Sequence, residues 1–168
     1  STTVGVNPGG ELGTAIDQRI RQTFEKYYAN FVKRRDSGKP WGAYTPYEWR
    51  TVGTFVQLGQ RQRAHEIADW FFTHQRPKEW HQWAEVVMEK VDSVQFIGDM
   101  PHTWVGSDFI RSMLDMFAYE NDNDSTLVIG AGIPSKWLRE DDGVGIRNLS
   151  THYGLLSYTM RAVPKGTE

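Results

Sequence analysis

The spacing of apolar residues changes from a helical repeat to a strand-like alternation near Asp124, and this change constrains the fold more than any other feature. Upstream, apolar side chains recur every three or four residues, as on one face of an α-helix. Downstream, they alternate with polar side chains, as in strands with one buried face. Because helices come first and strands last, this order predicts an α+β fold, with N-terminal helical hairpins followed by a small antiparallel β region.

About four helices are predicted in the upstream part. The first spans Glu11 to Arg35, after a polar, Gly-rich leader at residues 1–10. Its apolar face comprises Leu12, Ile16, Ile20, Phe24, Tyr27, Tyr28 and Phe31. The next begins at Thr45, which is the expected N-cap, and Glu48 completes a capping box. Further helices are expected at 61–75 and 106–119, and the short link at residues 59–60 makes the second and third an αα-hairpin.

The polar run 121–125 (NDNDS) is typical of a turn and marks the predicted boundary. After it, 127–129 is a short β-type run, and the segments 143–149 and 155–163 alternate in the manner of strands. A turn at residues 150–154 would join these two segments as a hairpin. The chain is therefore expected to divide into a helical region, residues 1–124, and a β-rich region, residues 125–168.

Composition removes several classes of function. The chain has 168 residues, 39% of them hydrophobic and 24% charged, which suits one domain with a core. A net charge of -2 gives no support for nucleic-acid binding, and no apolar run approaches the ~20 residues of a membrane span. Cysteine is absent, and the five histidines lack metal-ligand spacing with neighbouring acids. No metal and no cofactor are therefore expected.

The candidate chemistry lies between residues 82 and 104, where Gly and Pro interrupt the helical spacing. Glu85 and Asp99 are the candidate catalytic carboxylates, and His102, Trp83 and Trp104 are the candidate substrate-binding residues. Carboxylates transfer protons at a glycosidic bond, and aromatic faces stack on sugar rings. This pattern is therefore typical of a cleft that processes carbohydrate.

Each candidate also has a structural interpretation. Glu85 and Glu89 are four residues apart, as on the surface of one helix. Asp99 follows Gly98 and fits a residue that caps a turn. His102 fits a structural histidine with satisfied hydrogen bonds, and both tryptophans fit packing between helices. The sequence alone leaves these alternatives open.

The sequence around the candidates resembles a known family. The runs 83–85 (WAE) and 98–107 (GDMPHTWVGS) resemble the closing part of the catalytic toroid in bacterial (α/α)6 glycoside hydrolases. Within these hydrolases, the resemblance is to the poorly characterised group found with coagulation factor 5/8 type (discoidin) modules. Residues 127–138 and 151–160 resemble the step into the C-terminal β-domain of such enzymes and the strands of that domain.

This resemblance implies the hydrolysis of a glycosidic bond, in which Glu85 activates water or adjoins the residue that does, and Asp99 is a second carboxylate. An (α/α)6 toroid contains about twelve helices, whereas the apolar pattern here accounts for about four. The resemblance therefore implies that this chain is the C-terminal part of a larger enzyme. The general acid would then lie upstream, and the isolated chain would be inactive.

A carbohydrate substrate is the expected partner, with no nucleic acid and no membrane. The apolar stripes of a partial toroid would lack their partners, which predicts that the isolated chain either self-associates or holds together only because the β region covers one end. The stripes in question carry Phe24, Tyr28, Phe31, Phe71 and Phe72. The alternative is a non-catalytic α+β module that binds carbohydrate or another protein. Candidate residues gathered on one concave face would favour the enzyme, whereas dispersed residues and buried tryptophans would favour the module.

Overall fold

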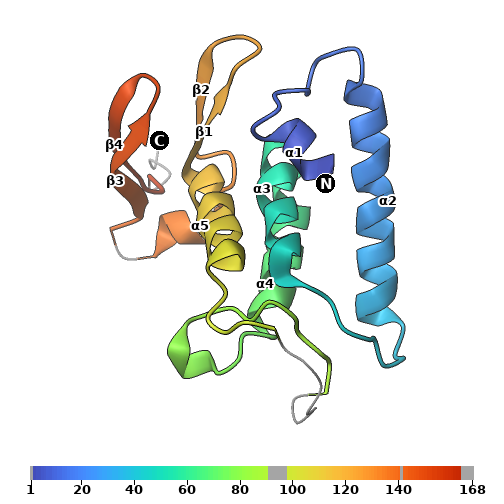
Figure 1. Cartoon of the computed structure of the whole chain (residues 1–168). Helices are drawn as coiled ribbons and strands as arrows, with labels where there is room; N and C mark the ends of the chain where they lie inside the picture. Colours follow the sequence, from blue (N-terminus) through green and yellow to red (C-terminus); the bar gives the residue numbers. More distant parts are fainter. Residues whose placement is uncertain (1, 91–97, 141, 164–168) are drawn as a thin grey trace, which may run out of the picture.

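The computed structural model describes residues 2–90, 98–140 and 142–163, and in these ranges helices precede strands (Figure 1). The two β-hairpins are each antiparallel, so the predicted α+β fold is confirmed. The helices are α1 (Thr2–Val6), α2 (Asp17–Asp36), α3 (Arg50–Gln57), α4 (Arg61–Phe72) and α5 (Thr103–Phe117). Short 3-10 turns are η1 (Pro46–Trp49), η2 (Lys78–Trp80) and η3 (Trp137–Arg139). The strands are β1 (Ala118–Asn121), β2 (Thr126–Ile129), β3 (Val144–Thr151) and β4 (Gly154–Met160).

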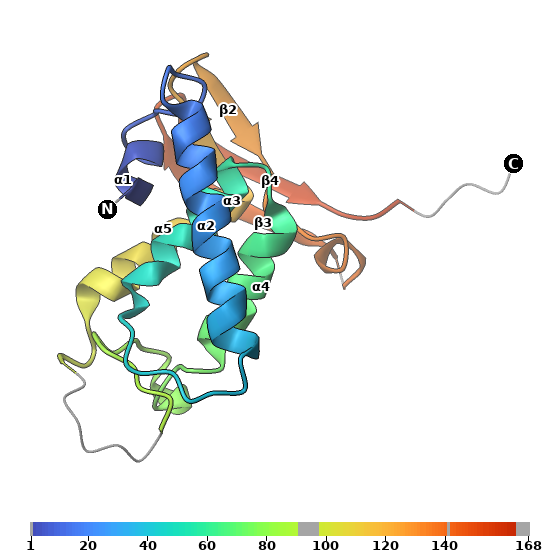
Figure 2. The ribbon, with the colours of Figure 1, turned by 90° about the vertical axis from the view of Figure 1, so that its right-hand side faces the viewer.

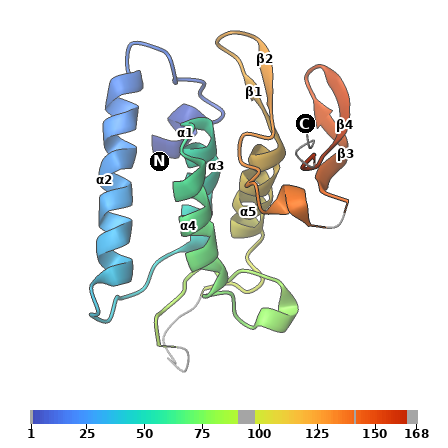
Figure 3. The same cartoon turned by 180° about the vertical axis from the view of Figure 1, so that it is seen from behind.

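The long helices lie side by side, with α3 and α4 between α2 and α5 (Figures 1 and 3). Consecutive helices run in alternating directions, and the β-hairpins lie on the α5 side of this layer, away from α2 (Figures 1 and 2). The C-terminal ends of α2 and α4 therefore meet the N-terminal ends of α3 and α5 at one end of the molecule. The connections at this end carry the candidate site residues.

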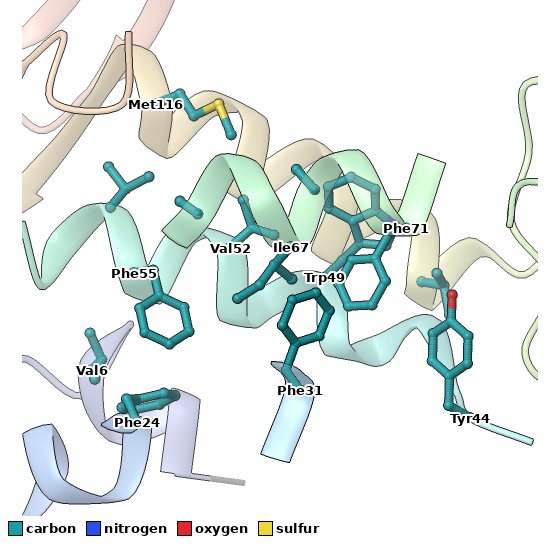
Figure 4. Close-up of a cluster of buried hydrophobic side chains, with 14 of the residues drawn as sticks. Val6, Phe24, Phe31, Tyr44, Trp49, Val52, Phe55, Ile67, Phe71 and Met116 are labelled. Carbon is teal, nitrogen blue, oxygen red and sulfur yellow. The ribbon is translucent and has the colours of Figure 1, made fainter. Parts of the chain in front are cut away.

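The core forms because the helix faces carry aromatic residues at helical spacing. Phe24 and Phe31 are seven residues apart on one face of α2, and both are buried. Phe24 meets Phe55 of α3 edge-on, with ring centroids 5.8 Å apart (Figure 4). Phe31 meets Trp70 of α4 with ring centroids 5.5 Å apart. Burial of each such side chain stabilises the fold by roughly 1.5–3 kcal/mol, so these contacts hold α2 against α3 and α4.

Three of the five aromatic residues on the predicted helix stripes are buried inside the chain, which corrects the expectation that these stripes stay exposed. Phe24, Phe31 and Phe71 are 3%, 2% and 0% exposed, whereas Phe72 is 39% exposed and Tyr28 is half-buried. The large apolar residues that remain exposed come from many different elements. Among the described residues, they are Val4, Ile16, Phe72, Trp80, Trp104, Ile110, Ile129, Tyr153, Leu155 and Val163. In the described ranges, no helix has both the length and the apolar character that a membrane span requires.

The N-terminal region differs from the predicted leader and long helix. Residues 2–6 form α1 and bury Val6 in the core, and α2 begins at Asp17 rather than at Glu11. Gly13 has a φ of +82°, a conformation that interrupts a helix, and its N–H donates to Asp17 Oδ1 at 2.9 Å. Leu12 still packs against the core, so the apolar spacing continues through a turn and gives no sign of the interruption.

The helix start predicted at Thr45 is the 3-10 turn η1, which leads into α3. Thr45 makes no capping hydrogen bond. Glu48 binds Arg34 of α2 through both oxygens, at 3.0 and 2.9 Å, and accepts a hydrogen bond from the Tyr27 hydroxyl at 2.6 Å. The predicted capping box is wrong because a guanidinium binds a carboxylate more strongly than a single backbone N–H does.

Strand β1 begins directly after α5, before the boundary predicted at residues 124 and 125. Ala118 pairs with Ile129, and Asn121 pairs with Thr126, so the polar run 121–125 contains the turn of the first hairpin. Residues 118–121 lack a distinct alternation because the apolar spacing of α5 runs on into them. The predicted division therefore falls inside a hairpin, and residues 164–168 of the predicted β-rich region lie outside the described ranges.

The second hairpin agrees with the alternation in the sequence. Val144 pairs with Met160 and Ile146 with Tyr158, so the predicted apolar positions share one face. The Tyr158 hydroxyl donates to the backbone carbonyl of Phe117 at 2.6 Å. This hydrogen bond ties the second hairpin to the last turn of α5.

Candidate functional site

Two segments that are distant in sequence lie side by side close to the start of α5. The backbone N–H of Glu85 donates to the Asp99 carbonyl at 3.1 Å, and the N–H of His102 donates to the Trp83 carbonyl at 2.8 Å. Residues 83–87 are not helical, so Glu85 does not lie on a helix surface. Residues 91–97 of the candidate stretch lie outside the described ranges. These backbone hydrogen bonds hold the described parts of both segments against each other.

Glu85, Asp99 and His102 come together in this arrangement. Each offers one carboxylate oxygen or ring nitrogen, and these atoms all lie within 4.8 Å of one another. The Asp99 N–H lies 3.4 Å from Glu85 Oε2, and His102 Nδ1 lies 3.8 Å from Asp99 Oδ2. The Asp99 side chain is 85% exposed, that of His102 is 14% exposed, and Glu85 is half-buried. The cluster thus presents one open carboxylate in front of two more enclosed groups.

Tyr47 of η1 holds the imidazole of His102. Its hydroxyl lies 2.5 Å from His102 Nε2, and the two ring centroids are 5.5 Å apart. Partial burial raises the pKa of Tyr47, and the negative charge of Glu85 raises it further. Tyr47 therefore stays protonated at neutral pH, and its hydroxyl can donate to Nε2 in the tautomer that carries the ring hydrogen on Nδ1. The sequence does not indicate this role, because Tyr47 lies in a run that predicts a helix start.

Gly98 allows the close approach of the two segments. Its φ is +68°, and a Cβ at this position would overlap the Glu85 carboxylate and lie 2.5 Å from Glu85 Cβ. Gly98→Ala is therefore expected to displace Glu85 from Asp99 and His102. It should lower the free energy of unfolding by more than the roughly 1–2 kcal/mol that a left-handed backbone conformation costs an alanine. Chemical denaturation measures the stability, and the NMR signals of the His102 ring report the displacement.

Gly38→Ala is the matched control for this substitution. Gly38 has a φ of +62°, but a Cβ there would meet nothing within 4 Å. The control variant therefore carries the backbone strain without the clash, and the His102 signals should not move. Equal loss of stability in both variants, with unchanged His102 signals, would show that Gly98 makes no close contact with Glu85.

The two candidate tryptophans have opposite environments. Trp104, in the first turn of α5, is 60% exposed and meets Tyr47 edge-on, with ring centroids 5.2 Å apart. Trp83 is 3% exposed and packs against Trp49 at 5.0 Å and Phe109 at 5.7 Å. Its ring offers no face to a sugar, so the predicted substrate-binding role of Trp83 is wrong. Aromatic residues from η1 and α5 enclose it, and local sequence gives no sign of those contacts.

A cavity of about 460 Å³ adjoins Tyr47 and Trp104. It lies between α1, α2, η1 and the start of α5. Its lining consists of Thr2, Thr3, Thr23, Phe24, Tyr27, Thr45, Tyr47, Glu48, Arg50, Thr51 and Trp104. Glu85, Asp99 and His102 do not line the cavity. Tyr47 connects the two, because its ring lines the cavity and its hydroxyl contacts His102.

Within the described ranges, Glu85, Asp99 and His102 form the group whose spacing could hold a metal ion. Carboxylates and imidazole are ligands of divalent transition metals. The spacing of histidines along the chain does not reveal this group, because His102 meets Glu85 through a tertiary contact. Comparison of the chain with protein-family models, with curated proteins and with solved structures finds no match. Function is therefore inferred from the residues and their geometry.

Proposed function

We propose that this chain is the C-terminal part of a glycoside hydrolase, and that Glu85, Asp99 and His102 form part of its catalytic cleft. The observation that carries this proposal is the convergence of these three residues from two separate segments, with the exposed ring of Trp104 nearby. Hydrolysis of a glycosidic bond needs carboxylates for proton transfer, and an aromatic face binds the sugar. The site supplies both.

The spacing of the two carboxylates limits their roles. In glycosidases, the two carboxyl groups that flank the bond are about 5–5.5 Å apart in retaining enzymes and about 6.5–9.5 Å apart in inverting ones. The ligand atoms of Glu85 and Asp99 lie within 4.8 Å of each other, which is shorter than both of these separations. We therefore place both carboxylates on the same side of the bond and assign the general acid to another part of the complete protein.

Glu85 is the proposed general base. It is half-buried and adjoins the Asp99 N–H, so its position is fixed relative to Asp99 and His102. A water molecule would lose its proton to Glu85 while its oxygen bonds to the anomeric carbon. The general acid from elsewhere would protonate the departing oxygen as the glycosidic bond breaks. Asp99 and His102 would hold the water or a sugar hydroxyl in place.

Assays of the complete protein and of this chain alone test the proposal. Both are incubated with a panel of aryl glycosides and polysaccharides, and released reducing sugar is measured. The complete protein is expected to hydrolyse at least one substrate, and this chain alone to hydrolyse none, since it holds one side of the site. Equal activity of the two, or inactivity of the complete protein on every substrate, would refute the proposal.

A self-contained module that binds carbohydrate or protein is the second candidate. The burial of Phe24, Phe31 and Phe71 favours it, because a partial toroid should leave such helix faces open. Light scattering at micromolar concentration distinguishes the candidates further. If this chain is a stable monomer that binds sugars, and the complete protein has no hydrolase activity, the binding module is the correct function. Self-association of the chain would instead support the partial toroid.

A further inference from the structure

We infer that the cavity beside Tyr47 and Trp104 binds a neutral sugar ring, and that it rejects uronic acids and other charged sugars. The inference rests on the proposed carbohydrate function and specifies the class of substrate. It depends on where the cavity lies, on the pairing of its charged residues, and on the mixture of rings and hydroxyl groups in its lining.

The position of the cavity connects it to the carboxylate cluster. The Tyr47 ring lines the cavity and packs against Trp104, while its hydroxyl lies 2.5 Å from His102 Nε2. A sugar in the cavity would therefore contact the residue that holds His102. The volume of about 460 Å³ is within the range of about 300–1,000 Å³ for small-molecule sites.

Both charged side chains of the lining already have partners of opposite charge. Glu48 accepts hydrogen bonds from Arg34 at 3.0 and 2.9 Å and from the Tyr27 hydroxyl at 2.6 Å. Arg50 donates to Asp108 Oδ2 through Nε at 3.1 Å and through a terminal nitrogen at 2.5 Å. An anionic ligand would approach the Glu48 carboxylate, and the Arg50 charge that could attract it is already balanced by Asp108, so it would gain little for the water it loses. The lining therefore favours a neutral ligand.

The remaining lining matches the two kinds of surface on a pyranose. Its C–H face can stack on aromatic rings, and Trp104, at 60% exposed, presents an open one. Its hydroxyl groups need hydrogen-bonding partners, and threonine side chains contribute to the lining. The hydroxyl groups of Thr23 and Thr51 donate to the backbone carbonyls of Arg19 and Glu48, and their oxygens can still accept a hydrogen bond from a sugar. A small neutral ligand with apolar faces and hydroxyl edges fits this surface better than a purely apolar one.

Calorimetric titration of the chain with methyl glycosides of neutral hexoses and pentoses tests the inference. Neutral glycosides are expected to bind at least about tenfold more tightly than the matched uronic acids. Trp104→Ala should weaken the binding of neutral glycosides by about tenfold or more, and Trp104→Phe, which keeps a ring, by less. Trp80→Ala is the matched control, because Trp80 is 57% exposed and does not line the cavity. Circular dichroism melting checks that each variant folds.

Three outcomes would overturn the inference: no binding of any neutral glycoside, equal binding of the uronic acids, or equal losses in Trp104→Ala and Trp80→Ala. The proposed hydrolase function can fail separately. If sugar binding depends on Trp104 but the complete protein hydrolyses nothing, the sugar site in the cavity is supported and the hydrolase function is refuted. Hydrolysis that Trp104→Ala leaves unchanged would support the hydrolase and remove the cavity assignment.

Discussion

Under the proposed hydrolase function, Glu85→Gln is expected to lower hydrolysis by the complete protein about a hundredfold or more and to leave its melting temperature nearly unchanged. Glutamine keeps the shape of the side chain and can still accept the Asp99 N–H, which lies 3.4 Å from Glu85 Oε2. It cannot take a proton from water at neutral pH. Because Glu85 is half-buried and outside the apolar core, the substitution removes chemistry rather than packing.

Glu89→Gln is the matched control for this variant. Glu89 is exposed, and its carboxylate accepts the Trp41 N–H at 2.9 Å, which a glutamine oxygen can also do. Its rate should match the unsubstituted protein. Asp99→Asn is expected to reduce hydrolysis less than Glu85→Gln does, since the proposal gives Asp99 an assisting role. Retained activity in Glu85→Gln together with a shifted melting temperature would identify Glu85 as a structural residue.

Asp115→Asn is expected to raise the free energy of unfolding by up to roughly 3 kcal/mol at pH 7 and by almost nothing near pH 4. Asp115 of α5 is 8% exposed, and burial raises its pKa to about 6. The positive charge of Arg111 and the hydrogen bond from Gln57, at 3.1 Å, offset only part of this shift, and the negative charge of Glu120 adds to it. Asparagine keeps an oxygen for Gln57 and carries no charge.

The direction of the pH effect follows from proton binding. Between about pH 4 and pH 6 the folded chain keeps a proton on Asp115 that the unfolded chain has lost, so stability from this group falls as pH rises. Urea denaturation across this range should show that decline in the unsubstituted chain and its absence in Asp115→Asn. Asp69→Asn, which alters an exposed carboxylate on α4, should keep the decline. Parallel profiles of stability against pH for all three proteins would show that Asp115 does not cause the decline.

Elements with a clear period were predictable from sequence, and short or tertiary-dependent ones were not. The repeat through Phe24 and Phe31 predicted α2, and the alternation around Ile146 predicted β3, because one face of each element is buried. α1 has five residues, too few to show a period. β1 follows α5 without a break in apolar spacing, and so the boundary was placed too late. Glu48 made a tertiary ion pair in place of the local cap.

The candidate site was predictable as a set of residue types but not as an arrangement. Glu85, Asp99 and His102 were singled out because they lie among aromatics in irregular backbone, and their contact depends on hydrogen bonds between two segments. Trp83 and Trp104 look alike in sequence, and only packing distinguishes the buried ring from the exposed one. Tyr47 had no signal of its own, because its role requires η1 to lie against the start of α5.

The direct passage from α5 to β1 has a mechanical consequence. α5 has 15 residues and rises roughly 22 Å, with Trp104 in its first turn and Ala118 of β1 immediately after its last. No flexible loop separates helix from strand, and the Tyr158 hydrogen bond to Phe117 adds the second hairpin to the same joint. α5 therefore connects the hairpins directly to the end of the molecule that carries the candidate site. Trp104 and the first hairpin belong to one continuous segment, so the position of the Trp104 ring against Tyr47 is coupled to the position of that hairpin.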